Sequence, residues 1–133
     1  MAPGFSIDVL CVFLAFLLIW VPQVYVARSR VAAGGYDKHQ PRDQQARLDA
    51  RGRRAAAAHT NTFEAFAPFA IAVIFARVTH ADRTWTNALC AAFVAARAVY
   101  PFVYVYDRPA LRSAVWCVGL VATGGLFLLA MIA

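Results

Sequence analysis

The stretch RAAAAHTNTFEAFAP, residues 54–68, turns from a charged segment into an apolar helix and decides the fold. Five of its residues recur at helical spacing and so share one stripe of a helix: Arg54, Ala57, Asn61, Glu64 and Pro68. An amide and a carboxylate are costly in hydrocarbon. We therefore expect Asn61 and Glu64 to face other helices or a wet cavity rather than lipid.

The composition around this stretch is that of a membrane protein. Hydrophobic residues make up 62% of the chain, whereas a soluble domain is about half apolar. A chain of 133 residues allows one domain, 1–133, with about four spans of roughly 20 residues. We predict an all-α membrane protein, a four-transmembrane-helix bundle, with spans at about 5–27, 55–78, 85–106 and 113–133. The first apolar run is too long for a signal peptide and is expected to remain as a span.

The basic residues are concentrated at one end of the predicted bundle. Eight of the thirteen lie between Arg28 and Arg54, in or beside the first loop, and the third loop carries Arg108 and Arg112. The rule that basic loops stay inside therefore places both chain termini outside and these two loops in the cytoplasm. The net charge of +6 thus reflects membrane topology rather than nucleic acid binding, and we expect no nucleic acid partner. No Gly-rich phosphate loop or metal-spaced Cys/His cluster is present in the sequence.

A second polar stripe lies within the third predicted span. Arg97, Tyr100 and Tyr104 recur at i, i+3 and i+7 and share a helix face. A buried arginine needs a counter-ion, and Glu64 is the simplest candidate. The two tyrosines have an alternative explanation as part of an interfacial aromatic belt.

Other polar or small residues inside the apolar runs have simpler expected roles. Asp8 is expected near the membrane interface, and the loop from Ala32 to Arg53 is expected to be mostly solvated backbone. Arg28 either anchors the first span at the interface or contacts a ligand. The cysteines are expected to be buried, inert thiols: Cys11, Cys90 and Cys117. Three glycines of the last span are expected to allow close helix packing: Gly119, Gly124 and Gly125.

The two stripes together resemble the MAPEG family, the membrane-associated proteins in eicosanoid and glutathione metabolism. The resemblance covers nearly the whole chain, through four spans, a basic first loop and the two motifs in order. These motifs are Arg54-(x6)-Asn61-(x2)-Glu64 and Arg97-(x2)-Tyr100-(x3)-Tyr104-(x7)-Arg112. The chain is most similar to the small bacterial members, which implies a multi-pass protein of the bacterial inner membrane.

The resemblance implies a homotrimer that binds glutathione in a cleft between subunits at the cytoplasmic side. A lipophilic substrate would enter from the membrane lipids, and no metal is implied. Arg112 matches the arginine thought to hold the glutathione thiolate, and it is the candidate catalytic residue. The candidate binding residues are Arg28, Arg54, Asn61, Glu64, Arg97, Tyr100, Tyr104 and Arg108. The expected activity is that of a glutathione transferase or peroxidase on lipophilic electrophiles or lipid hydroperoxides.

Two positions depart from the family pattern. The enzymes carry an arginine four residues before the Asn, where this chain has Ala57, and often an aromatic residue directly after the Glu, where it has Ala65. The non-catalytic lipid-binding member of the family also lacks that arginine. A catalytically silent scaffold that binds a lipid or another membrane protein is therefore the alternative function.

Overall fold

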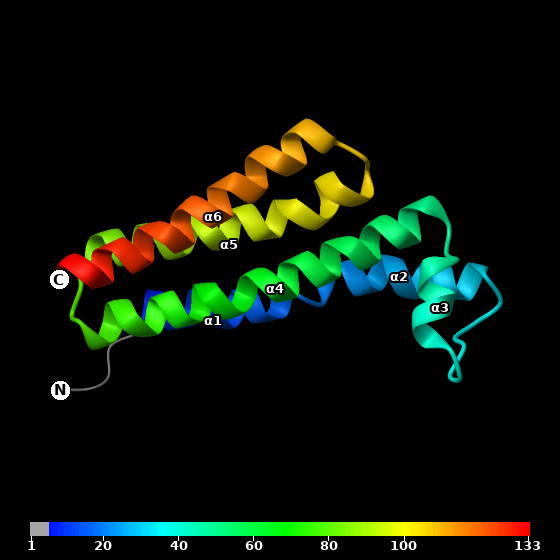
Figure 1. Cartoon of the computed structure of the whole chain (residues 1–133), viewed down its shortest axis with the longest axis horizontal. Helices are drawn as coiled ribbons and strands as arrows, with labels where there is room; N and C mark the ends of the chain where they lie inside the picture. Colours follow the sequence, from blue (N-terminus) through cyan, green and yellow to red (C-terminus); the bar gives the residue numbers. More distant parts are fainter. Residues whose placement is uncertain (1–5) are drawn as a thin grey trace.

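The computed structural model describes residues 6–133, and this part of the chain is helical. Within these described residues, four segments are long and apolar enough to cross a membrane, as predicted. In order they are α1 and α2 together (Ile7–Leu18 and Val21–Ala32), α4 (Ala50–Val78), α5 (Arg83–Val105) and α6 (Pro109–Ile132). A short helix, α3 (Pro41–Ala46), lies in the first connection. Figure 1 shows α1 and α2 following one another along α4, with α5 and α6 as a second antiparallel pair.

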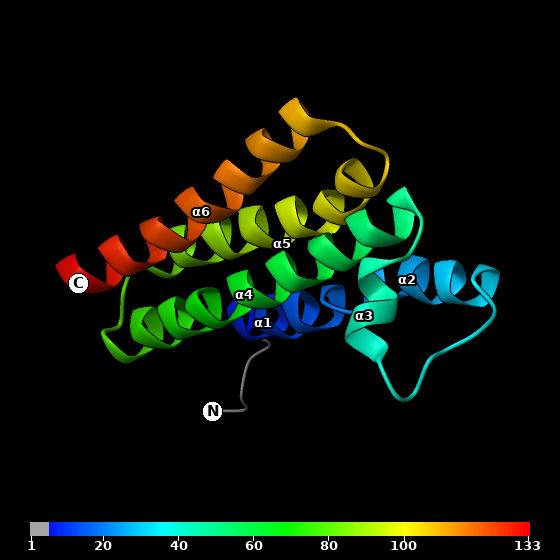
Figure 2. The ribbon, with the colours of Figure 1, turned by 45° about the vertical axis from the view of Figure 1, so that its right-hand side comes forward.

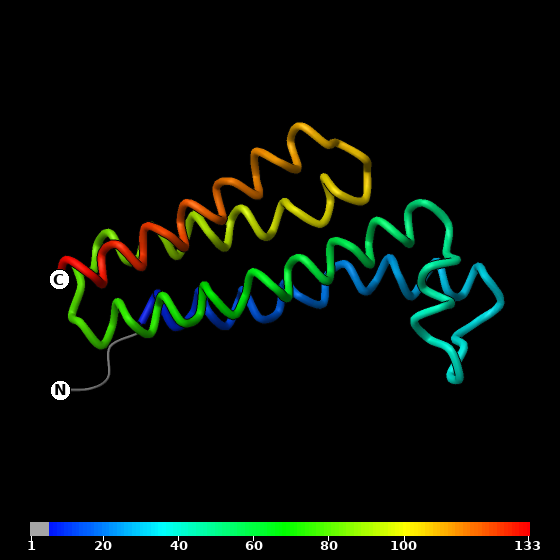
Figure 3. The backbone as a smooth tube through the Cα atoms, in the orientation of Figure 1, coloured from blue at the N-terminus to red at the C-terminus, as the bar shows by residue number. Residues whose placement is uncertain are grey.

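The elements place two sets of connections at opposite ends of the bundle. One end, here called the basic end, holds the loop around α3 and the turn between α5 and α6 (Figures 1 and 3). The opposite end holds the turn between α4 and α5. Turning the ribbon shows that α2 and the loop after it reach past the turn between α5 and α6, whereas α3 lies below the start of α4 (Figure 2). The sequence prediction that both basic loops share one end is therefore confirmed.

The first span is broken in its middle, where the sequence predicted a continuous run. Pro22 has no N–H to donate to the preceding turn, and α1 ends at Leu18. The N–H of Gln23 bonds to the Trp20 carbonyl, one residue short of the α-helical partner. The Ile19 carbonyl released in this way lies 2.8 Å from Nδ1 of His59 on α4. A carbonyl oxygen only accepts hydrogen bonds, so His59 is the donor here. This bond replaces the backbone hydrogen bond that the Ile19 carbonyl loses at the break.

Helix α4 begins at Ala50, earlier than the predicted start near residue 55. The Asp49 side chain accepts a hydrogen bond from the Gly52 N–H at 3.0 Å and caps the helix. A Cβ at position 52 would lie 2.7 Å from both Cβ and Oγ of Ser29, so glycine lets α2 approach α4 closely. Helix α5 begins in the same way, with Asp82 accepting from the Trp85 N–H at 2.9 Å.

The loop before α4 is more ordered than the predicted solvated backbone. The Gln44 side chain donates to the Gly35 carbonyl and accepts from the Asp37 N–H. The Asp37 carboxylate accepts from two further N–H groups, of Gln40 and His39. These N–H groups hold the pKa of Asp37 below its ordinary value. The loop thus folds around side-chain hydrogen bonds that a charge pattern does not reveal.

The interior has two apolar clusters, one along the bundle and one at the basic end. The first is built around Phe69 and Phe93, whose rings stack in parallel with centroids 3.8 Å apart. The second comprises Val26, Leu48, Ala55, Ala56 and Val105. Large apolar side chains remain exposed elsewhere, for example Phe13 at 55%, Ile74 at 58% and Leu128 at 62%. Such an apolar exterior suits contact with lipid.

Candidate functional site

One face of α5 carries a continuous row of stacked polar and aromatic side chains. The guanidinium carbon of Arg97 lies 4.9 Å from the centre of the Tyr100 ring. The Tyr100 and Tyr104 rings meet edge to face, with centroids 5.6 Å apart and planes at 75°. The guanidinium carbon of Arg112, on α6, lies 4.6 Å from the centre of the Tyr104 ring. Cation–π contacts of this kind stabilise the rings and the guanidinium groups in these positions.

The inner end of this row reaches α4 through Asn61 rather than Glu64. Nη1 of Arg97 donates to Oδ1 of Asn61 at 2.9 Å. Within residues 6–133 no carboxylate forms an ion pair with Arg97, so the predicted Glu64–Arg97 pair is wrong. Asn61 and Glu64 share a stripe, but the rotation of α4 points the amide at Arg97 and leaves Glu64 exposed.

Arg97 is almost fully enclosed, although it carries a charge. It is 3% exposed, and its Nε has no hydrogen-bond partner within the described chain. The guanidinium also lies over the Phe93 ring, with the carbon 5.5 Å from the ring centre. One neutral amide and two aromatic faces thus surround the cation.

A cavity of about 240 Å³ adjoins Arg97 between α4, α5 and α6. Its polar wall comes from Asn61, Glu64 and Arg97. The other lining residues are mostly apolar: Ala65, Pro68, Phe93, Trp116, Gly119, Leu120 and Thr123. The structure therefore brings Arg97 of the α5 stripe together with one part of the α4 stripe, Asn61, Glu64 and Pro68. The other predicted site residues, including Tyr100, Tyr104 and Arg112, do not line this cavity.

The contribution of α6 to this cavity was missed by the sequence analysis. A Cβ at Gly119 would lie 3.4 Å from both Nε and Nη2 of Arg97, so glycine leaves the guanidinium its place. Trp116, Gly119 and Thr123 recur at i, i+3 and i+7, and that spacing was the available signal. Of the other glycines, Gly125 is close to Leu89, whereas nothing lies within 4 Å of a Cβ at Gly124.

The remaining predicted arginines lie at the basic end, apart from the cavity. Arg54 Nε donates to the Val105 carbonyl at 3.1 Å, and Arg54 Nη1 is 3.8 Å from Asp107. These contacts tie the start of α4 to the end of α5. Arg28 and Arg108 are exposed. Ala57, where the family enzymes have an arginine, is half-buried and brings no charge to the stripe.

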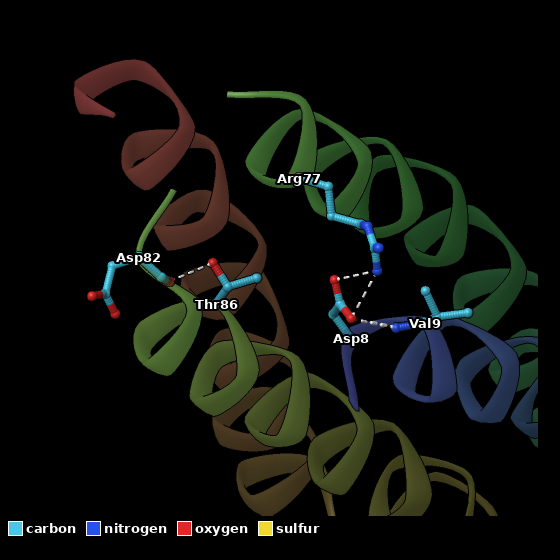
Figure 4. Close-up of polar contacts among 5 residues, drawn as sticks. All are labelled: Asp8, Val9, Arg77, Asp82 and Thr86. Carbon is cyan, nitrogen blue, oxygen red and sulfur yellow. Dashed lines mark hydrogen bonds and ion pairs between the residues drawn. The ribbon is translucent and has the colours of Figure 1, made fainter. Parts of the chain in front are cut away.

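Asp8, expected near the membrane interface, lies at the start of the first span and forms an ion pair that the sequence did not reveal. Both of its carboxylate oxygens accept from Nη1 of Arg77, at 3.0 and 2.9 Å (Figure 4). Asp8 is 8% exposed and joins the start of α1 to the last turn of α4. A cavity of about 310 Å³ adjoins this pair, lined also by His80 and Arg83. This ion pair fastens the bundle at the end opposite the stacked row.

The cysteines divide into two groups. Cys11 and Cys90 are buried in the first apolar cluster, as predicted, whereas Cys117 on α6 is exposed. No group of three or more His, Cys, Asp or Glu side chains is placed to hold a metal ion among residues 6–133.

Comparison with known families decides the membership of the chain. The model of the MAPEG family matches residues 8–132, nearly the whole chain. The chain belongs to the MAPEG family. Neither the comparison with curated proteins nor that with solved structures gives a match. As a MAPEG protein with four candidate spans, it is a multi-pass membrane protein, and this membership is consistent with a membrane glutathione transferase-like or related function.

Proposed function

We propose that this protein binds glutathione at the basic end of the bundle and activates its thiol for reaction with a lipophilic substrate. The observation that carries the proposal is the stacked row from Arg97 to Arg112, which ends in a guanidinium held over the Tyr104 ring. A thiol with a pKa near 8.5 is mostly protonated at neutral pH. A fixed guanidinium favours the thiolate, which is the nucleophile.

The chemistry follows from that thiolate. In the reaction with an electrophile, the thiolate sulfur forms a bond to the electrophilic carbon. The electron pair of the bond that breaks goes to the leaving group, or to the ring oxygen when the electrophile is an epoxide. Toward a lipid hydroperoxide, two glutathione molecules supply two electrons, so that a disulfide, an alcohol and water are formed. Arg112 is the proposed catalytic residue in both reactions because it stabilises the attacking sulfur anion.

The polar wall of the cavity supports a zwitterionic ligand. Arg97 and Glu64 present opposite charges to one space, and Asn61 adds an amide. The γ-glutamyl end of glutathione carries an ammonium and a carboxylate, which complement such a pair. Tyr104 and the buried Tyr100 connect this wall to Arg112 through the stacked row. The other candidate binding residues, Arg28, Arg54 and Arg108, lie at the basic end, beyond the cavity.

The size of the cavity supports a site shared between subunits. Small-molecule sites commonly occupy about 300–1,000 Å³, whereas the cavity beside Arg97 has about 240 Å³ in one subunit. Glu64 is exposed on its wall, where a neighbouring copy would cover it. We therefore propose a homotrimer in the bacterial inner membrane, with the basic end in the cytoplasm and both termini outside.

Calorimetry and activity assays with purified protein test this function. The wild type is expected to bind glutathione and to conjugate a lipophilic electrophile. Arg112→Ala should lower conjugation by about ten- to a thousandfold, about 1.4 kcal/mol for each factor of ten. Glutathione affinity should change much less, because Arg112 acts mainly on the sulfur. A wild type without glutathione binding or thiol-dependent activity contradicts the proposal.

A non-catalytic scaffold is the second candidate function. Ala57 favours it, since the stripe lacks a cation there, and Arg54 is already engaged by Val105 and Asp107. In that case the same cavity would bind a lipid or a membrane partner. Binding of a lipid analogue without glutathione binding would support the scaffold over the enzyme.

A further inference from the structure

A second group of aromatic and basic side chains lies at the basic end and takes no part in the stacked row. Tyr25 of α2 and Tyr106, directly after α5, meet edge to face with centroids 6.5 Å apart and planes at 84°. The guanidinium carbon of Arg51, in the first turn of α4, lies 5.6 Å from the centre of the Tyr106 ring. We call Tyr25, Arg28, Arg51 and Tyr106 the rim cluster; it joins three helical segments.

The rim cluster is positively charged. Arg51 lies over the Tyr106 ring, and Arg28, which is exposed, follows Tyr25 by one turn on α2. Two carboxylates lie nearby: Asp49 caps α4 beside Arg51, and Asp107 lies 3.8 Å from Arg54, so they offset only part of the positive charge. The two chain segments that carry the cluster's arginines hold five arginines: Arg28, Arg30, Arg51, Arg53 and Arg54. This surface therefore carries cationic groups that can bind an anion.

The depth of the rim cluster corresponds to lipid headgroups. Helix α4 has 29 residues, a length of about 44 Å, whereas the hydrocarbon core is about 30 Å thick. The start of α4, with Arg51, therefore extends beyond the hydrocarbon. Tyrosine is enriched at this boundary because its ring is apolar and its hydroxyl is polar.

Apolar surface continues from the rim cluster toward the membrane interior. Val24 precedes Tyr25 and is 53% exposed. Phe102, one turn before Tyr106, is 44% exposed. A ligand held by the cluster thus has an apolar helix surface beside it, as an acyl chain requires and a soluble anion does not.

We propose that the rim cluster is a binding site for the phosphodiester headgroup of an anionic phospholipid. Arg28 and Arg51 donate hydrogen bonds to the phosphate oxygens, and the hydroxyls of Tyr25 and Tyr106 donate from the other side. The acyl chains lie along Val24 and Phe102. Basic pockets between membrane helices on the cytoplasmic side are suited to such headgroups. The bound lipid would bridge α2, α4 and the end of α5.

Native mass spectrometry of the full chain tests the site with two probes of equal chain length, phosphatidylglycerol and phosphatidylcholine. Wild type is expected to retain phosphatidylglycerol in preference to phosphatidylcholine. Arg51→Gln should weaken phosphatidylglycerol binding about tenfold, the loss expected for one hydrogen bond to a charged group. Arg42→Gln is the matched control, since it removes the same charge from exposed α3 and should change binding less than twofold.

A second variant keeps the charge unchanged. Tyr25→Phe with Tyr106→Phe preserves both rings and removes only the hydroxyls, so it should fold and still lose phosphatidylglycerol preference severalfold. Glutathione binding should persist in this variant, because neither tyrosine belongs to the proposed glutathione site. Equal losses in Arg51→Gln and Arg42→Gln would overturn the proposal in favour of unspecific charge attraction. Equal retention of the two lipids by wild type, or full displacement by millimolar inorganic phosphate, would also overturn it.

Discussion

Nη1 of Arg97 and Oδ1 of Asn61 share a hydrogen bond of 2.9 Å between α5 and α4. A neutral amide thus holds a cation that is 3% exposed. Glu64 remains on the cavity wall and is exposed. Asn61 therefore orients Arg97, whereas Glu64 makes no bond to that guanidinium.

Asn61→Ala is expected to destabilise the protein clearly. It leaves the buried guanidinium without its hydrogen-bond acceptor, and a hydrogen bond to a charged group contributes about 1.5–3 kcal/mol. The melting temperature in mild detergent, at fixed protein concentration, should fall accordingly. Glu64→Gln is the comparison, because Glu64 makes no ion pair with Arg97 and should change the melting temperature little. A larger loss in Glu64→Gln than in Asn61→Ala would contradict the observed pairing.

The Asp8–Arg77 pair should respond unequally to removal of its two members. The Arg77 side chain is 47% exposed and Asp8 only 11%, so Arg77 finds water without its partner and Asp8 does not. Arg77→Gln leaves a largely buried carboxylate and should lower the melting temperature more than Asp8→Asn. With half of the arginine in solvent, the coupling between the two is expected to be at most about 1 kcal/mol. Additive losses in the double-mutant cycle would show that the two side chains do not interact.

Acid should weaken the start of α4 through Asp49. Hydrogen bonds from the Ser29 hydroxyl and then from the Gly52 N–H hold the pKa of Asp49 below its ordinary value. The unfolded chain therefore binds a proton at higher pH than the folded chain does. The stabilising contribution is complete above the ordinary pKa of about 4 and is lost as the pH falls through the lowered value. Melting temperatures measured between pH 6 and pH 3 should fall less steeply for Asp49→Asn than for wild type. Asp43→Asn, in the exposed α3, should follow the wild-type slope.

The exposed polar wall of the cavity leads us to expect an oligomer. Glu64 lies in a span and would face lipid in an isolated subunit, which is unfavourable. We expect native mass spectrometry in mild detergent to show a trimer over a range of protein concentrations. A monomer across that range would contradict both the trimer and the shared site.

Ala57→Arg should strengthen glutathione binding if the family geometry holds. The substitution places a guanidinium one turn before Asn61 on the α4 stripe, where the family enzymes carry theirs. A charge-assisted hydrogen bond to a glutathione carboxylate, worth about 1.5–3 kcal/mol, raises affinity about tenfold or more. Isothermal titration calorimetry measures the gain, with Ala57→Gln as the uncharged control. If neither wild type nor Ala57→Arg binds glutathione, the cavity is better assigned to a lipid or protein partner.

The spans and the helix faces of the two polar stripes were predictable because each depends on sequence spacing alone. Apolar runs gave four helices, and i, i+3, i+7 patterns gave the faces of Asn61 and Tyr100. The partner of Arg97 was not predictable in this way. Asn61 and Glu64 differ by one turn on the same stripe, so the choice between them depends on the rotation and register of α4 against α5. Spacing along one helix does not contain that information.

The breaks and starts of helices were harder to predict than the residues that share a helix face. Pro22 lies within the first apolar run, but the sequence does not say where that helix breaks or whether a carbonyl freed there finds a donor. The helix start at Ala50 depends on the contact of Gly52 with Ser29, which is a tertiary relation between α4 and α2. The role of Gly119 likewise appears only when Arg97 is placed against α6.

The bond from His59 to the Ile19 carbonyl ties the bend of the first span to α4. A carbonyl in hydrocarbon finds no water to replace a lost helical partner, so an acceptor left without a donor at this depth is costly. The imidazole takes the place of that water, and the elbow of the first helix needs no wet defect in the lipid beside it.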